Sequence, residues 1–65
     1  MKVTYFQDTD TLYIKFRAGS VDETRDLDKN TLLDLDADGQ VVALTVEHAS
    51  ERADMPHFSY EQVAA

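Results

Sequence analysis

Three aspartates at alternate positions, followed by a glycine, are the residues of this sequence whose spacing most suggests chemistry. They are Asp34, Asp36, Asp38 and Gly39. A calcium-binding loop places oxygen ligands at its first, third and fifth positions, glycine at its sixth and a bidentate glutamate at its twelfth. The twelfth position here is Thr45, which cannot supply two carboxylate oxygens, and Glu47 comes two residues too late.

The flanks of this stretch favour a β-hairpin over a calcium site. Residues 31–36 and 41–47 carry strand periodicity rather than helical periodicity. An Asp-Gly pair suits the turn between them, because glycine adopts a positive φ at little steric cost. Alternate aspartates then lie on one face of a strand. We therefore predict a hairpin, with weak surface binding of a divalent ion left open.

The two histidines are the other candidate metal ligands. His48 and His57 are nine residues apart, a spacing that matches no motif such as His-Glu-x-x-His. Weak candidates for a metal site are therefore His48, Glu51 and His57, which could gather around one ion with the hairpin aspartates. The alternative, two surface histidines beside carboxylates, is the interpretation we adopt. None of the serines lies in a Gly-x-Ser-x-Gly motif, and the sequence has no cysteine, so it contains no motif for a catalytic nucleophile. We expect no catalytic residue and no cofactor.

The length of the chain limits its core. Its 65 residues make a single domain over residues 1–65, in which residues 52–65 either pack on the sheet or form a loose tail. A chain this short buries only about 60% of the surface that its unfolded form exposes. Without cysteine, disulfides and thiolate zinc sites are excluded. Tight packing, a carboxylate or histidine metal site, or self-association remain as sources of stability.

The charge balance excludes several classes of partner. Thirteen Asp and Glu against six Lys and Arg give a net charge of −7. Such a surface repels phosphate backbones and anionic membranes, so we expect neither nucleic acid nor membrane as a partner, whereas a basic protein would suit it. No apolar run approaches the roughly 20 residues of a membrane span, and no segment resembles a signal peptide. We expect a cytoplasmic protein.

Alternating apolar residues predict four strands, at residues 3–6, 12–17, 31–36 and 41–47. The clearest is residues 12–17, where Leu12, Ile14 and Phe16 share one face. The last strand is apolar on both faces, which predicts a central position in the sheet. Its Val42, Leu44 and Val46 share one face, and Leu33 and Leu35 are expected to be buried. Residues 21–27 are ambiguous between a loop and an exposed edge strand.

The remaining residues suggest a little helix. Residues 48–53 contain good helix formers, Pro56 prevents a continuous helix, and Ser59 to Gln62 match a capping box. Met55, Phe58, Tyr60 and Val63 could pack this segment onto the sheet. We therefore predict an α+β domain, a small antiparallel four-stranded β-meander with a short C-terminal helix.

Several motifs together resemble those of a small bacterial family, domain-of-unknown-function family 2283, the YuzE-like proteins. The matching segments are residues 1–5, residues 8–16, the Glu23-Thr24-Arg25 segment, the hairpin of residues 33–44 and His48-Ala49-Ser50. The resemblance covers residues 1–52, with two departures: members often have glycine at the position of Ala43 and an acidic residue at that of His48. It implies a small antiparallel sheet with a short helix, and it supplies no catalytic residues. Some members look like one half of a two-gene module beside a toxin, which implies an antitoxin-like role.

Two functions follow as hypotheses. The first is a non-enzymatic acidic binding or interaction module, an antitoxin-like partner of a basic protein. The second is a small metal-assisted hydrolase that uses a His and carboxylate cluster. In either case apolar residues on the second face of the sheet predict self-association, most simply as a two-fold homodimer.

Overall fold

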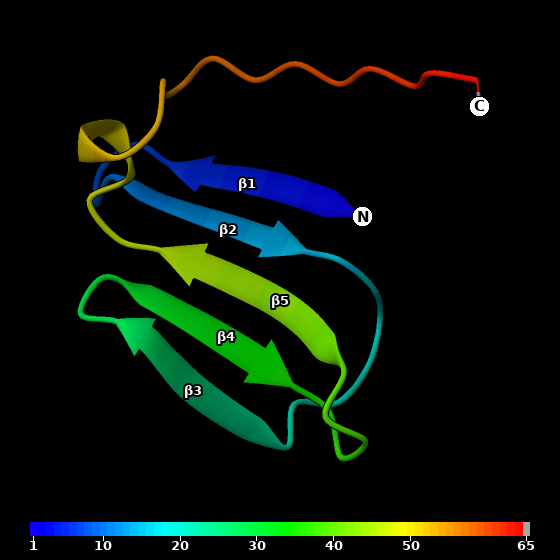
Figure 1. Ribbon diagram of the computed structural model, residues 1–65. Helices are drawn as coiled ribbons and strands as arrows, with labels where there is room; N and C mark the ends of the chain where they lie inside the picture. The colour runs from blue at the N-terminus through cyan, green and yellow to red at the C-terminus, as the bar shows by residue number, and fades with distance from the viewer. Residues whose placement is uncertain (65) are drawn as a thin grey trace.

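The computed structural model describes residues 1–64 and forms a five-stranded antiparallel β-sheet (Figure 1). The strand order is β1-β2-β5-β4-β3. The strands are β1 (Lys2–Phe6), β2 (Thr11–Lys15), β3 (Glu23–Asp28), β4 (Thr31–Leu35) and β5 (Val41–Val46), and one turn of 3-10 helix, η1 (Ala49–Glu51), follows. The four predicted strands are confirmed to within two residues at each end, and β5 occupies the centre as its two apolar faces predicted.

The predicted four-stranded meander with a C-terminal helix is wrong. The segment left ambiguous at residues 21–27 forms β3, the outermost strand, in which every residue is exposed. Both faces of this edge strand are exposed, so its sequence does not alternate between apolar and polar residues. The alternation that predicts a strand is therefore missing from it. The connection from β2 leads to β3 at the opposite edge of the sheet. The chain then forms β4 next to β3, and β5 fills the position between β4 and β2.

No α-helix occurs within residues 1–64. After β5 the chain makes only η1, which is preceded by His48 in the left-handed conformation, with φ of 53°. Residues 54–64 form no regular helix or strand, and no helix begins at the capping box of residues 59–62. Helix nucleation is unfavourable, and so short a segment cannot recover its cost without packing against a core.

The strand register defines the two faces of the sheet. Ile14 lies opposite Leu44, which lies opposite Leu33 on the next strand. One face therefore carries Val3, Tyr5, Leu12, Ile14, Leu33, Leu35, Val42, Leu44 and Val46, and we call it the apolar face. The opposite face is mixed and includes Thr4, Phe6, Tyr13, Lys15, Ala43 and Asp34. The predicted grouping of the β4 and β5 side chains on one face is confirmed.

The core is confined to the middle of the sheet. The molecule measures 36 × 32 × 18 Å, too thin for a second layer of structure across the whole sheet. Val42 and Ala43 of β5 are 1% and 0% exposed, and the loop at Gly19 passes over Val42, because a Cβ placed there would lie 3.7 Å from Val42 Cγ2. Most other residues of the apolar face are only half-buried.

Leucines in β4 and β3 give a matched test of this core. Leu35 is 6% exposed, whereas Leu27 is 57% exposed. We expect Leu35→Ala to lower the free energy of unfolding by about 2–4 kcal/mol, because it leaves a cavity beside β5. Leu27→Ala should change it by about 0.5 kcal/mol or less. Urea denaturation followed by circular dichroism measures both, and equal losses would contradict the placement of the core.

Candidate functional site

The acidic hairpin loop is a turn closed by Asp36. Asp36 Oδ1 accepts hydrogen bonds from the amides of Asp38 and Gln40, both at 2.9 Å, and Asp36 Oδ2 pairs with Arg17. The amide of Gly39, whose φ is 80°, donates to the Asp36 carbonyl at 3.0 Å. The amide of Gln40 is the main cause that lowers the pKa of Asp36, with the Asp38 amide and Arg17 adding to it. The predicted hairpin is confirmed.

The other two aspartates of the motif do not converge with Asp36. Asp34 Oδ1 accepts a hydrogen bond from the hydroxyl of Thr24 on β3 at 2.8 Å. A register shift separates Asp34 from Leu35, and Asp38 lies in the exposed turn. Within residues 1–64 there is no group of three or more His, Cys, Asp or Glu side chains arranged to hold a metal ion.

The three weak candidates for a metal site are not brought together as a set. His48 Nδ1 lies 3.4 Å from Glu51 Oε2, and both side chains are largely exposed. His57 lies in the segment after η1, where its amide donates to the carbonyl of Asp54 at 2.9 Å. What this arrangement offers is one solvent-exposed ion pair, formed when His48 is protonated.

A corner built around Asp10 was not anticipated from the sequence. Asp10 Oδ1 accepts a hydrogen bond from the Tyr5 hydroxyl at 2.5 Å, and Asp10 Oδ2 accepts one from the Ser50 hydroxyl at 2.7 Å. The Ser50 amide also donates to Asp10 Oδ1, at 3.0 Å, and the Ala49 amide donates to the Asp10 carbonyl, at 2.9 Å. We call Tyr5, Asp10, Ala49 and Ser50 the Asp10 corner. It ties the β1–β2 turn to η1.

The Asp10 corner is suited to holding structure rather than to catalysis. The hydrogen bond from Tyr5, and after it the bond from Ser50, holds the pKa of Asp10 below its usual range. The hydrogen bond between Tyr5 and Asp10 also raises the pKa of Tyr5. A carboxylate with a lowered pKa is a poor general base. The Ser50 hydroxyl donates its hydrogen bond to this carboxylate and not to an imidazole. The hydroxyl therefore lacks the adjacent base that activates a serine nucleophile. Sequence analysis could not pair Asp10 with Ser50, because the two lie 40 residues apart in separate segments, although both segments are among those that resemble the family.

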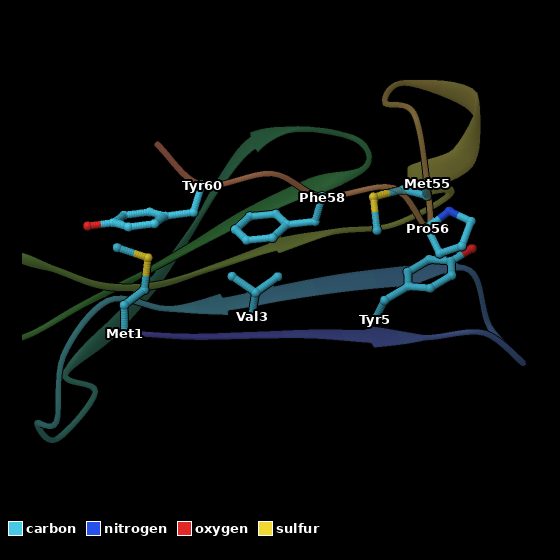
Figure 2. Close-up of a pocket in the computed structure, with 7 residues that line it drawn as sticks. All are labelled: Met1, Val3, Tyr5, Met55, Pro56, Phe58 and Tyr60. Carbon is cyan, nitrogen blue, oxygen red and sulfur yellow. The ribbon is translucent and has the colours of Figure 1, made fainter. Parts of the chain in front are cut away.

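An apolar groove runs between β1 and the C-terminal segment (Figure 2). Its volume is about 540 Å³, and its lining consists of Met1, Val3, Tyr5, Met55, Pro56, Phe58 and Tyr60. Figure 2 shows the side chains of Met1, Val3 and Tyr5 directed toward this segment. Phe58 and Tyr60 nevertheless remain 66% and 78% exposed, so the groove is open. Three of the four residues expected to pack on the sheet line it, whereas Val63 is 75% exposed.

The charges divide the sheet into two halves. Residues 22–38, which contain β3, β4 and the loops beside them, carry seven acidic and two basic side chains; we call this region the acidic half. Residues 1–17, which contain β1 and β2, carry three basic and two acidic side chains. Asp22, Asp26 and Asp38 of the acidic half are exposed and form no ion pair within the described residues.

Comparison with known proteins yields one match. A protein-family model described as "Protein of unknown function (DUF2283)" matches residues 2–50, which hold all five strands and the whole Asp10 corner. No curated protein and no solved structure matched the chain. The C-terminal side of the groove, from Met55 to Tyr60, lies outside the matched residues.

Substitution of Asp10 tests the Asp10 corner through its pH dependence. Because the folded-state pKa of Asp10 is lowered, its stabilising contribution is present above the unfolded pKa of about 3.9 and is lost as pH falls through the lower folded pKa. Asp10→Asn keeps a residue that tolerates the φ of 54° observed there. We expect it to lower the urea midpoint at neutral pH and to flatten the decline in acid.

Asp8→Asn is the matched control, because it removes the same charge from an exposed side chain two residues away that accepts no hydrogen bond within residues 1–64. If both variants show the same acid profile as the parent protein, the Asp10 corner does not stabilise the fold in the way its geometry indicates.

Proposed function

Because the chain belongs to the family described as protein of unknown function DUF2283, we propose for it a role as a non-enzymatic acidic binding module in the cytoplasm. The family expected from the sequence is confirmed, while the narrower YuzE-like name stays a prediction. Within residues 1–64 no helix has the length and apolarity that crossing a membrane requires. The absence of cysteine from the sequence is compatible with a reducing compartment.

The observation that carries this proposal is the acidic half of the sheet. Its exposed carboxylates lie on two adjacent strands and their loops, where they create a negative field that attracts a basic protein and repels nucleic acid. An antitoxin-like partner of a basic protein fits this surface. The apolar groove supports a non-enzymatic role, since its lining contains no carboxylate or imidazole for acid–base chemistry.

Self-association is the second part of the proposal. The molecule exposes 5100 Å², whereas a folded monomer of 7.4 kDa exposes about 4200 Å² by the usual size scaling. The excess of about 900 Å² is close to the roughly 800 Å² that each partner contributes to an interface of standard size. The open apolar face and the extended C-terminal segment both contribute to it. We therefore propose a two-fold homodimer.

Sedimentation velocity at micromolar concentration tests the homodimer. We expect a species with twice the 7.4 kDa mass of the chain, because association removes half-buried apolar surface from water. The mass should fall toward that of the single chain on dilution. A species of 7.4 kDa alone, at every concentration, would contradict self-association.

Neutralising the acidic half tests the binding role. We propose as the probe the product of the adjacent gene in the native host, on the condition that its sequence has a net positive charge. We expect Asp22→Asn, Asp26→Asn and Asp38→Asn together to weaken its binding roughly three- to hundredfold, from about 0.2–1 kcal/mol for each exposed charge. Binding should also weaken as salt rises, since salt screens exposed charges. Isothermal titration calorimetry at two ionic strengths measures both effects.

A control with the same charge change is available outside the acidic half. Asp8→Asn, Asp54→Asn and Glu61→Gln remove three exposed carboxylates from the β1–β2 turn and the C-terminal segment. This variant should bind almost as well as the parent protein. Equal weakening by the two triple variants would mean that net charge, and not the acidic half, governs binding.

A further inference from the structure

We infer that the outer edge of β1 pairs with the same strand of a second copy, so that two sheets join antiparallel across a two-fold axis. This inference rests on the proposed self-association and assigns it to the β1 edge of the sheet rather than to the apolar face. The observations that carry it are the contrast between the two edges of the sheet, the order of residues in β1 and the distribution of charge.

The two edges of the sheet are protected to different degrees. The β3 edge carries Glu23, Arg25, Asp26 and Asp28, and its register shifts between Asp26 and Asp28. Charges and bulges of this kind keep an edge from pairing with another chain. The β1 edge has no register shift and carries one charge, at its end. Its only charged side chain is that of Lys2, and the rest of the strand is Val3, Thr4, Tyr5 and Phe6.

The backbone of β1 is free to pair on its outer side. Within residues 1–64 its backbone hydrogen bonds run to β2 alone. The C-terminal segment runs alongside β1 without joining the sheet (Figure 1), and the backbone hydrogen bonds of Met55 and His57 are local, to residues two and three positions earlier. Side chains of this segment face those of β1 across the groove instead (Figure 2). A row of unpaired amides and carbonyls therefore remains available.

The sequence of β1 is complementary to itself when a two-fold axis passes through Thr4. That axis pairs all five residues of the strand: Lys2 with Phe6, Val3 with Tyr5, and Thr4 with Thr4 of the second copy. A β-branched residue beside an aromatic ring, and threonine beside threonine, are favourable cross-strand pairs. An axis through Val3 or Tyr5 leaves part of the strand unpaired. The arrangement also places no like charges opposite each other.

The charges at the two ends of β1 also match in this arrangement. Lys2 and its neighbour Lys15 on β2 lie at one end, and the turn that begins after Phe6 carries Asp8 and Asp10 at the other. Antiparallel pairing brings the basic end of each copy to the acidic end of its partner. At longer range the acidic halves lie at the far edges of the joined sheet, so that two chains of net charge −7 meet through their least acidic parts.

Substitutions at the two-fold axis test the inference by charge. We expect Thr4→Lys and Thr4→Glu each to raise the dissociation constant of the dimer about tenfold, because each places two like charges opposite each other. An equimolar mixture of the two variants should recover the parent affinity through Lys–Glu pairing. Sedimentation measures the association, and circular dichroism checks that each variant is folded. Leu27→Lys and Leu27→Glu make the same changes at an exposed position of the opposite edge and should leave the constant unchanged.

Amide hydrogen exchange of the parent protein gives a second readout that needs no variant. Exchange in β1 should slow as concentration rises, while exchange in β3 stays the same. A parent protein that is monomeric throughout overturns this inference together with the proposed homodimer. A parent dimer that is unchanged by either Thr4 variant, and shows no slowing in β1, overturns the edge pairing alone and assigns the dimer to another surface, such as the apolar face.

Discussion

The burial of β5 between β2 and β4 is the interaction on which the rest of this structure depends. The sheet is essentially one layer, so its central strand is the part whose side chains are removed from water on both faces, as Val42 and Ala43 are. The apolar residues of the neighbouring strands are covered only in part. Such a fold has little hydrophobic stabilisation to spare, which is why hydrogen-bonded connections such as the Asp10 corner and the Asp36 turn matter to it.

The features that sequence analysis predicted correctly are those encoded locally. Apolar alternation located four strands, two apolar faces located the central one, and Asp-Gly located the β4–β5 turn. The errors arose where the signal was weak or not local. An edge strand of charged residues carries no alternation, as β3 shows. Helix propensity near the C-terminus was not supported by packing. The hydrogen bonds between Asp10 and Ser50 depend on a turn and a 3-10 helix that only the folded sheet brings together.

Charge and hydrophobicity are separated in space on this small sheet. Acidic side chains concentrate on β3, β4 and their loops, while the groove and the less acidic strands lie at the other edge. One molecule of this kind can use its two edges for different contacts at the same time. Electrostatic attraction at the acidic half acts over about 8 Å at physiological salt, whereas strand pairing at β1 needs direct contact. The proposed association with a partner protein and the proposed pairing with a second copy therefore need not compete.

The central place of β5 also has a consequence for the order in which the chain folds. β2 and β5 pair residues that are 28 to 34 positions apart, such as Lys15 with Ala43 and Leu12 with Val46. During synthesis the β1–β2 hairpin and the β3–β4 hairpin are complete before β5 exists, and each alone is marginally stable in water. Closing the loop between β2 and β5 carries an entropic cost that must be met before the core forms. The last strand made thus converts two unstable hairpins into one cooperative unit, and a ribosome-bound chain that ends before Val41 has no folded core.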